Sequence, residues 1–355
     1  MAKRKRALFL INSLTDKASG YSDGAFSLYF DGGECVLSNI ETRGGYYGFL
    51  ISNPSGSALG KIVGSNLLVN GASDYGILIG ANDWDVFGSI NLSNVTIEDT
   101  ANFYNLYLRG QFSQFTCTGF SSKGGPYGIR SDPKSSFGQF TLGGFTIDGA
   151  TTEPLSLENL TNFSISGGSI KKINTTGAAL RLRNSSEGTV GNVFISLAAS
   201  SSSAWGVFLN ATSPGATDSV SIDNVQVSMP SGTATGVNLD DAVTNCTIGP
   251  SCELRTCSTP IRWGSGSGHR GGYLSGSTTY DPPSLSPGSG ITAMVPIPGA
   301  QVGDAVNASF SQNLQGMTLS AEIDSFGQAS VRFQNTTGGT IDLASGTVRA
   351  TAFKI

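Results

Sequence analysis

Charged residues recur about every 25 residues through the middle of this chain, a spacing too regular to ignore. Two of them are acidic, Asp132 and Glu158. The others are four arginines, with one tyrosine alongside: Arg109, Arg130, Arg181, Arg183 and Tyr107. Carboxylates bind sugar hydroxyls or act as acid and base, arginines bind acidic groups, and aromatic rings stack on the faces of sugar rings. If the fold places these residues on one face, they predict a carbohydrate site.

Three interpretations of this group stay open. Asp132 and Glu158 are catalytic candidates, since two carboxyl groups about 5 Å apart suit a retaining glycosidase and a wider pair suits an inverting one. The group could instead bind a glycan without cleaving it. It could also be a ladder of opposite charges that neutralise each other on an exposed sheet or between subunits. Because guanidinium groups favour ionised carboxyls, whereas a general acid must hold a proton, the pattern favours binding over hydrolysis.

A second candidate is the short stretch NDWD, at positions 82–85. Trp84 stands between Asp83 and Asp85, an arrangement that suits a sugar platform flanked by hydrogen-bonding carboxylates. Asn and Asp are also common turn formers and need no ligand. We therefore treat Asp83, Trp84 and Asp85 as carbohydrate-binding candidates on a turn.

The elements that must position these residues come from a repeat. Segments such as YGFLIS, YGILIG, YGIRSD and WGVFLN return along the chain, each with alternating apolar residues. Taking the first inward apolar residue of each copy as an anchor gives the series Phe49, Ile77, Leu106, Ile129, Leu155, Leu180, Val207, Val237 and Ile261. Self-similarity at a near-constant period indicates a stacked architecture.

Two further short strand-like segments lie between successive anchors, separated by Gly, Asn and Ser, and no helical pattern intervenes. Three strands in a unit of about 26 residues predict a right-handed three-sheet parallel β-helix of about nine coils. Residues one and three positions after an anchor should then face outward. That rule places the charged group on the outer face of one sheet, and it predicts that Leu50 and Leu78 are exposed there.

The chain divides into four predicted parts. Residues 1–25 form an arm that contains the basic run KRKR, and residues 26–263 form the β-helix. Residues 264–290 are rich in Gly, Ser and Pro and read as a linker. In residues 291–355 the period is lost and six longer alternating segments predict a small antiparallel β-sandwich, so the chain is all-β.

Composition excludes several classes of function. The net charge of −4 gives no general basic field for nucleic acid, and no stretch is long and apolar enough for membrane insertion. Five cysteines match no zinc spacing, and the one histidine, His269, leaves no Ser-His-Asp arrangement. We expect no metal and no cofactor.

The last 65 or so residues carry a recognisable set of motifs: GA-x2-GD, an L-x-G-x-x-L step and N-x-TGGTIDLASGT-x-R. With the β-helix before them, these motifs resemble bacteriophage tailspikes and related virion fibres. The resemblance implies a homotrimer on the virion, at the tail or the head surface, assembled in the cytoplasm of the bacterial host. Residues 1–25 would then attach it to tail or capsid proteins.

The function we predict is that of a tailspike or receptor-binding protein that attaches the phage to its host by recognising a bacterial surface polysaccharide. A capsid decoration (cement) protein, or another virion fibre, is the alternative from a different class. A polysaccharide depolymerase is a third option.

Overall fold

The structure is a computed structural model of the 355-residue chain. It describes residues 8–17, 26–29, 33–53, 60–173, 176–198, 203–213, 215–229, 234–249, 251–255, 257–267, 269–297 and 299–354. Every regular element among these residues is a β-strand, and they divide between two compact units. The first lies within Met1–Cys246 and Ser251–Ser267, the second within Thr247–Pro250 and Gly268–Ile355.

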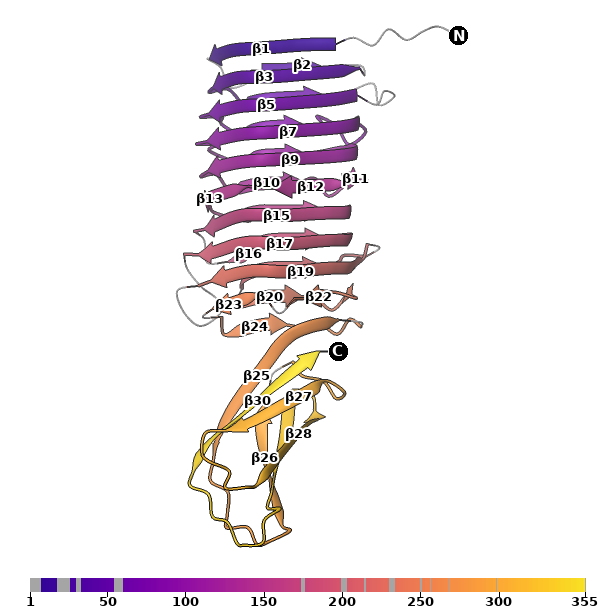
Figure 1. Ribbon diagram of the computed structural model, residues 1–355. Coiled ribbons are helices and arrows are strands. Elements are labelled where there is room, and N and C mark those ends of the chain that lie inside the picture. Colours follow the sequence, from indigo (N-terminus) through magenta and orange to yellow (C-terminus); the bar gives the residue numbers. More distant parts are fainter. Residues whose placement is uncertain are drawn as a thin grey trace, which may run out of the picture. The chain divides into compact units, whose positions relative to one another are not determined.

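The first unit is a parallel β-helix, as the repeat predicts (Figure 1). One of its sheets, here the short-strand sheet, has ten parallel strands. These are β2 (Phe26–Tyr29), β4 (Tyr47–Ser52), β6 (Tyr75–Ile79), β8 (Tyr104–Leu108), β10 (Tyr127–Ser131), β14 (Leu155–Glu158), β16 (Gly177–Arg183), β18 (Ala204–Asn210), β20 (Thr235–Leu239) and β24 (Thr259–Arg262).

The nine predicted anchors lie in β4 to β24, and each pairs in register with the next, from Phe49 opposite Ile77 to Val237 opposite Ile261. All nine are buried, with 5% exposure or less. The predicted register is therefore confirmed.

In most coils the other two predicted strands join into one long strand, which the sequence did not predict. Eight long strands result: β1 (Leu8–Lys17), β3 (Glu34–Arg43), β5 (Gly60–Asn70), β7 (Val86–Glu98), β9 (Gln111–Lys123), β15 (Thr161–Lys172), β17 (Ser186–Leu197) and β19 (Thr217–Ser228). Two coils keep the break, as β11 (Ser136–Phe137), β12 (Phe140–Gly143) and β13 (Thr146–Ala150), and as β21 (Val243–Thr244), β22 (Thr247–Ile248) and β23 (Glu253–Arg255).

Left-handed residues bend the long strands without ending them, one each in β3, β5, β7 and β9 and two each in β15, β17 and β19. In β3, β5 and β7 this residue is asparagine, with φ of 53° at Asn39, 52° at Asn66 and 51° at Asn94. Asparagine tolerates this conformation better than most side chains. The amides also join the coils, because Asn66 Nδ2 donates to Asn39 Oδ1 at 2.9 Å and Asn94 Nδ2 donates to Asn66 Oδ1 at 3.2 Å.

Close packing explains why the dipeptide Tyr-Gly opens several short strands. A Cβ on Gly76 would lie 2.5 Å from Asn105 O and 2.5 Å from Ile97 Cγ2, and a Cβ on Gly48 would lie 2.4 Å from Val69 Cγ1. No side chain fits there, since the strand begins against the opposite wall of the β-helix. Inside that wall, aromatic rings stack between coils, as in Phe87, Phe112 and Phe137 with centroids 5.2 and 4.8 Å apart.

The second unit contains two antiparallel sheets. β25 (Arg270–Tyr280) and β27 (Ala305–Phe310) pair with β30 (Gly346–Lys354), and β26 (Gly290–Pro296) and β28 (Thr318–Ser325) pair with β29 (Gln328–Gln334). Phe333 of β29 contacts Phe310 of β27 and Tyr280 of β25, with centroids 5.1 and 5.7 Å apart. The two sheets therefore pack face to face as the predicted sandwich.

Three predicted features differ in detail. β1 pairs in parallel with β3, so the segment predicted as an arm, residues 1–25, contains a strand of the β-helix. The basic run at residues 3–6 lies outside the described residues. Residues 264–290, predicted as a linker, contain β25. The glycines of this segment made it look like a linker. At Gly276, however, close packing requires the glycine, since a Cβ there would lie 1.8 Å from Pro296 O. The segment near Ile341, predicted as a strand, forms only an isolated bridge with Leu285.

Candidate functional site

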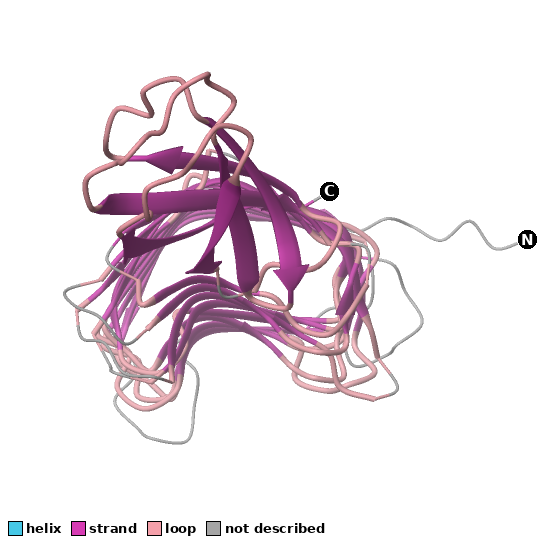
Figure 2. Cartoon of the chain, turned by 90° about the horizontal axis from the view of Figure 1, so that it is seen from below, coloured by secondary structure: helices cyan, strands magenta, loops and turns pink. Residues whose placement is uncertain are grey.

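Several outward side chains of the short-strand sheet are buried. Seen along the axis, the sheet lines an indented wall with loops projecting on either side (Figure 2). Side chains one position after the anchors were expected to be exposed, yet Ser156 is 2% exposed, Phe208 8% and Asn238 1%. Because these side chains are buried, part of the outer face of the short-strand sheet is closed to solvent.

Leu50 and Leu78 show the same effect, and their predicted exposure is wrong. Each is 7% exposed. Leu50 lies opposite Leu78 in the cross-strand register, and Leu78 lies opposite Tyr107. Neighbours in such a column cover each other's apolar surface. An exposed leucine pair is therefore no reason for this sheet to bind other copies of the chain.

Seven aromatic rings form a continuous group over the first coils, here the aromatic band. Its members are Tyr46, Tyr47, Tyr75, Phe103, Tyr104, Tyr107 and Tyr127. Tyr47, Tyr75, Tyr104 and Tyr127 begin successive short strands and lie opposite one another in register. Tyr104 is central, stacked on Tyr107 at 4.5 Å and 4.9 Å from Tyr127 between centroids. Phe103 is 44% exposed, so one edge of the band is open.

Charged side chains continue from the aromatic band. Tyr107 Oη donates to Asp132 Oδ2 at 2.6 Å, and burial together with this bond raises the pKa of the Tyr107 phenol. Arg109 Nε lies 2.7 Å from Asp83 Oδ1 and 3.8 Å from Asp132 Oδ2, so one guanidinium group serves two carboxylates. Lys134 Nζ lies 2.7 Å from Asp83 Oδ2. Hydrogen bonds from Lys134 and Arg109 lower the pKa of Asp83.

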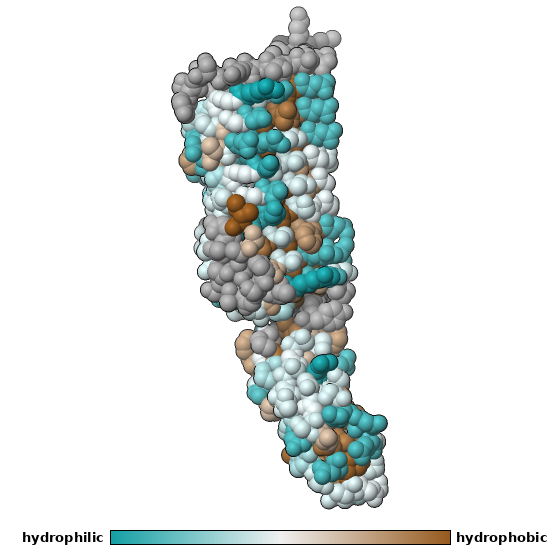
Figure 3. All heavy atoms as spheres, turned by 90° about the vertical axis from the view of Figure 1, so that its left-hand side faces the viewer, coloured by the Kyte–Doolittle hydropathy of each residue, from teal (hydrophilic) through white to brown (hydrophobic). Residues whose placement is uncertain are grey.

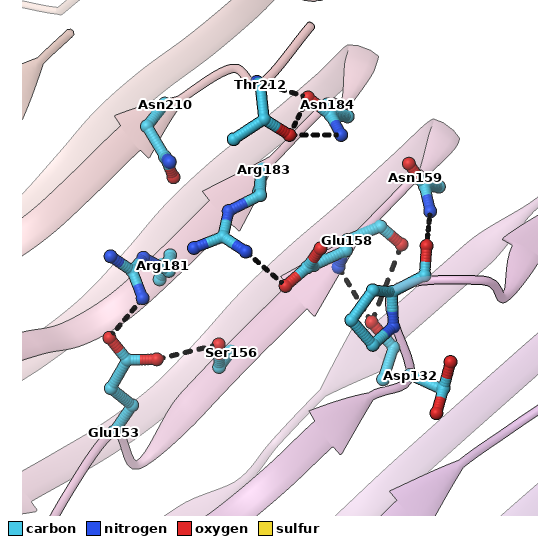
Figure 4. A network of polar contacts seen from close by, with 12 residues as sticks. Asp132, Glu153, Ser156, Glu158, Asn159, Arg181, Arg183, Asn184, Asn210 and Thr212 are labelled. Atoms are coloured by element: carbon cyan, nitrogen blue, oxygen red, sulfur yellow. Dashed lines mark hydrogen bonds and ion pairs between the residues drawn. The ribbon is translucent and has the colours of Figure 1, made fainter. Parts of the chain in front are cut away.

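Two more ion pairs follow along the same face (Figure 4). Arg181 Nη1 lies 2.6 Å from Glu153 Oε1, and Ser156 Oγ donates to Glu153 Oε2 at 2.9 Å. Arg183 Nη1 lies 2.9 Å from Glu158 Oε1. Together, the sequence-predicted arginines and carboxylates do share one face.

Asp132 and Glu158, however, do not form a pair of facing carboxyls. In Figure 4 the Glu158 carboxylate points to Arg183, and that of Asp132 points away from it. Glu158 is only 4% exposed, although the sequence predicted that it faces outward on one sheet. Both carboxylates lie near a guanidinium group: Glu158 beside that of Arg183, and Asp132 beside that of Arg109, which also pairs with Asp83. The arrangement suits polar binding better than acid catalysis, which needs a protonated group.

The three NDWD candidates have different surroundings. Trp84 is 61% exposed and Asp83 belongs to the Arg109 ion pair. Asp85 is fully buried, and its Oδ2 accepts hydrogen bonds from Ser52 Oγ at 2.7 Å and from Ala81 N at 2.9 Å. Asp85 therefore holds a turn and cannot reach a ligand, while Asp83 and Trp84 remain accessible.

Several members of this face escaped the sequence prediction: Tyr75, Tyr104, Tyr127, Lys134 and Glu153. Tyr75 and Tyr127 were visible as the first residue of the repeated Tyr-Gly motif, and Tyr104 holds the same position, two before its anchor, in a copy that has Asn105 in place of glycine. Lys134 was not, because its partner Asp83 is 51 residues away and on a different coil.

The rest of the surface carries few apolar side chains. In the part of the β-helix that the structure describes, the exposed large ones are Trp84, Phe103, Ile173 and Phe194. The side of the molecule in Figure 3 shows apolar atoms in scattered spots among polar and weakly apolar ones. Among the described residues, no group of three or more His, Cys, Asp or Glu could hold a metal ion, and no helix could cross a membrane. The cysteines are all free thiols.

Comparison with solved structures finds phage tailspikes. The tailspike protein gp49 of Pseudomonas phage LKA1 is 12% identical with a TM-score of 0.42, and the match covers 91% of this chain and 68% of that one. The tailspike gp61 of Pseudomonas phage phi297 is 11% identical with a TM-score of 0.36, covering 91% and 67%. A tailspike variant of Escherichia coli bacteriophage HK620, in complex with a hexasaccharide, is 10% identical with a TM-score of 0.37, covering 98% and 86%.

No protein-family model and no curated protein matches the sequence. The similarity to these tailspikes is one of fold, because the sequences are only 10–12% identical. The function of this chain has to follow from its own residues, since one fold supports many functions.

Proposed function

We propose that this chain is a tailspike-like receptor-binding protein that holds a bacterial surface polysaccharide along the outer face of its short-strand sheet. The observation that carries the proposal is the aromatic band, continued by ion pairs on the same face. Sugar rings present apolar C–H faces to aromatic rings, and their hydroxyls bond to charged side chains at the edges. A row of such groups on successive coils suits a repeating polymer.

The geometry supports binding rather than cleavage. Asp83, Asp132, Glu153 and Glu158 each lie beside a cation. A depolymerase of the usual type needs one carboxyl group that keeps its proton near neutral pH. Release of reducing ends from a bound polysaccharide would contradict this part of the proposal.

The test is binding of the full chain to immobilised capsular polysaccharides and O-antigens purified from many bacteria. Tyr104→Ala removes the central ring, and we expect it to weaken binding at least about tenfold, as for a ring at the centre of an interface. Phe194→Ala is the matched control, since it removes an exposed ring from the long strand β17. Circular dichroism would check that both variants fold.

Two results would overturn the proposal. One is that the wild-type chain binds none of the polysaccharides. The other is that Tyr104→Ala binds as tightly as the wild type, or that Phe194→Ala loses as much affinity as Tyr104→Ala.

The assembly belongs to the same proposal. Three copies on the phage tail, assembled in the host cytoplasm and attached through residues 1–25, are what the tailspike-like motifs of the C-terminal region support. Electron microscopy of intact virions separates the alternatives. A few copies at the tail vertex fit a receptor-binding protein, and many copies over the head fit a decoration protein.

A further inference from the structure

Arg130 differs from the other cations on the outer face of the short-strand sheet. Its neighbours have carboxylate partners: Arg109 and Lys134 with Asp83, Arg181 with Glu153 and Arg183 with Glu158. Arg262, on the last strand of the sheet, is exposed and donates to the amide oxygen of Asn238 at 3.4 Å. The guanidinium group of Arg130 makes no hydrogen bond or ion pair with the residues that the structure describes. Its guanidinium carbon instead lies 4.7 Å from the centre of the Tyr127 ring and 5.5 Å from that of Tyr104.

The carboxylate that interacts electrostatically with Arg130 already accepts hydrogen bonds from other residues. Glu153 acts on Arg130 electrostatically, but its two oxygens accept hydrogen bonds from Arg181 at 2.6 Å and from Ser156 at 2.9 Å. Figure 4 shows both of these bonds. The N–H groups of Arg130 are therefore donors without an acceptor from the described residues.

The surroundings prepare Arg130 for an anion. The side chain is half-buried, so part of the water that would solvate its charge is excluded. Two ring faces hold the guanidinium group, whose planar fork matches a carboxylate or a phosphate. The neighbouring carboxylates are compensated by cations of their own, so an incoming anion meets an uncompensated positive charge.

We infer that the polysaccharide bound on this face is acidic, and that Arg130 binds its anionic group while an adjoining sugar ring packs on Tyr104 or Tyr127. The inference rests on the proposed function and adds the chemical class of the ligand. Carboxylates of uronic or sialic acid residues and phosphate diesters between sugars share this chemistry. The whole chain has a net charge of −4, so general attraction to polyanions is absent and the recognition is local.

The experiment compares chemically matched polysaccharides on the same array. Each acidic polysaccharide is present in its native form and after carbodiimide and borohydride reduction, which converts carboxylates to primary alcohols. Those with phosphate on a side branch are also treated with aqueous hydrofluoric acid, which removes the phosphate and leaves the main chain intact. We expect the wild-type chain to bind acidic polymers and to lose at least about tenfold in affinity when the anionic group is removed. The treatment that causes the loss tells carboxylate from phosphate.

Arg130→Gln should weaken binding of the native polymer by a similar factor, and removal of the anionic group should then have no further effect. Arg130→Lys keeps the charge but loses the planar fork, so it should recover part of the affinity. Arg255→Gln is the matched control, because Arg255 pairs with Glu253 on another strand, β23. Thermal unfolding of each variant checks folding. Arg130→Gln should remain folded, since the Arg130 side chain has no hydrogen bond to a described residue that the substitution would remove.

The inference is overturned if the wild type binds neutral and acidic forms equally, or if Arg130→Gln and removal of the anion weaken binding additively. It is also overturned if Arg255→Gln loses as much affinity as Arg130→Gln. Failure to bind any polysaccharide would contradict the proposed function itself, which is a different outcome from binding a neutral one.

Discussion

Asp132 and Glu158 carry the same charge on neighbouring coils, but their surroundings assign them different roles. Glu158 is 4% exposed, and its backbone N–H donates to Ser131 Oγ at 2.7 Å. That bond gives a reason for the one polar residue, Ser131, among the inward positions two after the anchors. Asp132, just after the end of β10, accepts hydrogen bonds from Tyr107 Oη and from the backbone N–H of Lys134. We therefore propose that Glu158 has a structural role and that Asp132 is the carboxylate of the two that a ligand could reach.

Substitution of each carboxyl by its amide should separate these roles. Glu158→Gln leaves the half-buried Arg183 without a counter-charge, so we expect it to lower the free energy of unfolding by about 2 kcal/mol. Asp132→Asn keeps a hydrogen-bond acceptor at a more exposed position and should cost less than about 1 kcal/mol. Chemical denaturation measures both. A larger loss from Asp132→Asn would contradict the assignment.

Lys172 gives a pH-dependent prediction. The side chain is fully buried, its Nζ donates to Thr176 O at 2.5 Å, and burial lowers its pKa to about 8 from the ordinary 10.5. The folded protein therefore releases this proton near pH 8, while the unfolded chain keeps it to about pH 10.5. Between these values the unfolded state binds more protons, so the contribution of Lys172 to stability improves as pH rises.

Lys172→Met removes this titration. Any stability advantage of the variant over the wild type should be greatest at pH 7, where folded Lys172 is charged, and should fall by about 1 kcal/mol per pH unit between pH 8 and 10. Tyrosine titration affects both proteins and cancels in the difference. Free energies of unfolding that differ by the same amount at every pH would show that Lys172 titrates normally.

At the scale of the strand, the close approach at the Tyr-Gly motif can be tested by adding one methyl group. In Gly76→Ala the new Cβ would lie 2.5 Å from a backbone oxygen, so we expect a loss of about 1–3 kcal/mol in the free energy of unfolding. Gly143→Ala is the matched control in the same β-helix, because its Cβ would meet nothing nearer than 3.9 Å. Equal effects of the two substitutions would show that the glycines serve backbone flexibility and not packing.

The anchor column could be predicted from the sequence because burial of one apolar residue per coil leaves a periodic signal. The bends could not be predicted, since one left-handed residue such as Asn66 redirects a strand while the ladder continues. Strand β25 was not predicted because its glycines suggested a loop, whereas Gly276 is needed for the close approach of Pro296. The site was predicted only in part, because its ion pairs join coils and do not follow local sequence.

At the scale of the whole molecule, a β-helix offers a long face on which one site can extend over many coils. On the outer face of the short-strand sheet, aromatic rings and ion pairs extend over several coils, while the buried anchor residues inside keep the strands in register. If tailspike-like assembly applies, light scattering should give three times the chain mass of 36.6 kDa at micromolar concentration. A mass of one chain would contradict the trimer without affecting the site.

The central claim is that a polysaccharide lies along the outer face of the short-strand sheet. A crystal structure of the full chain, with an oligosaccharide fragment of a polysaccharide that it binds, tests this directly. We predict sugar density over Tyr104 and Tyr127, with an anionic group within hydrogen-bond distance of Arg130. Density confined to the long strands or to the C-terminal sandwich would contradict the account.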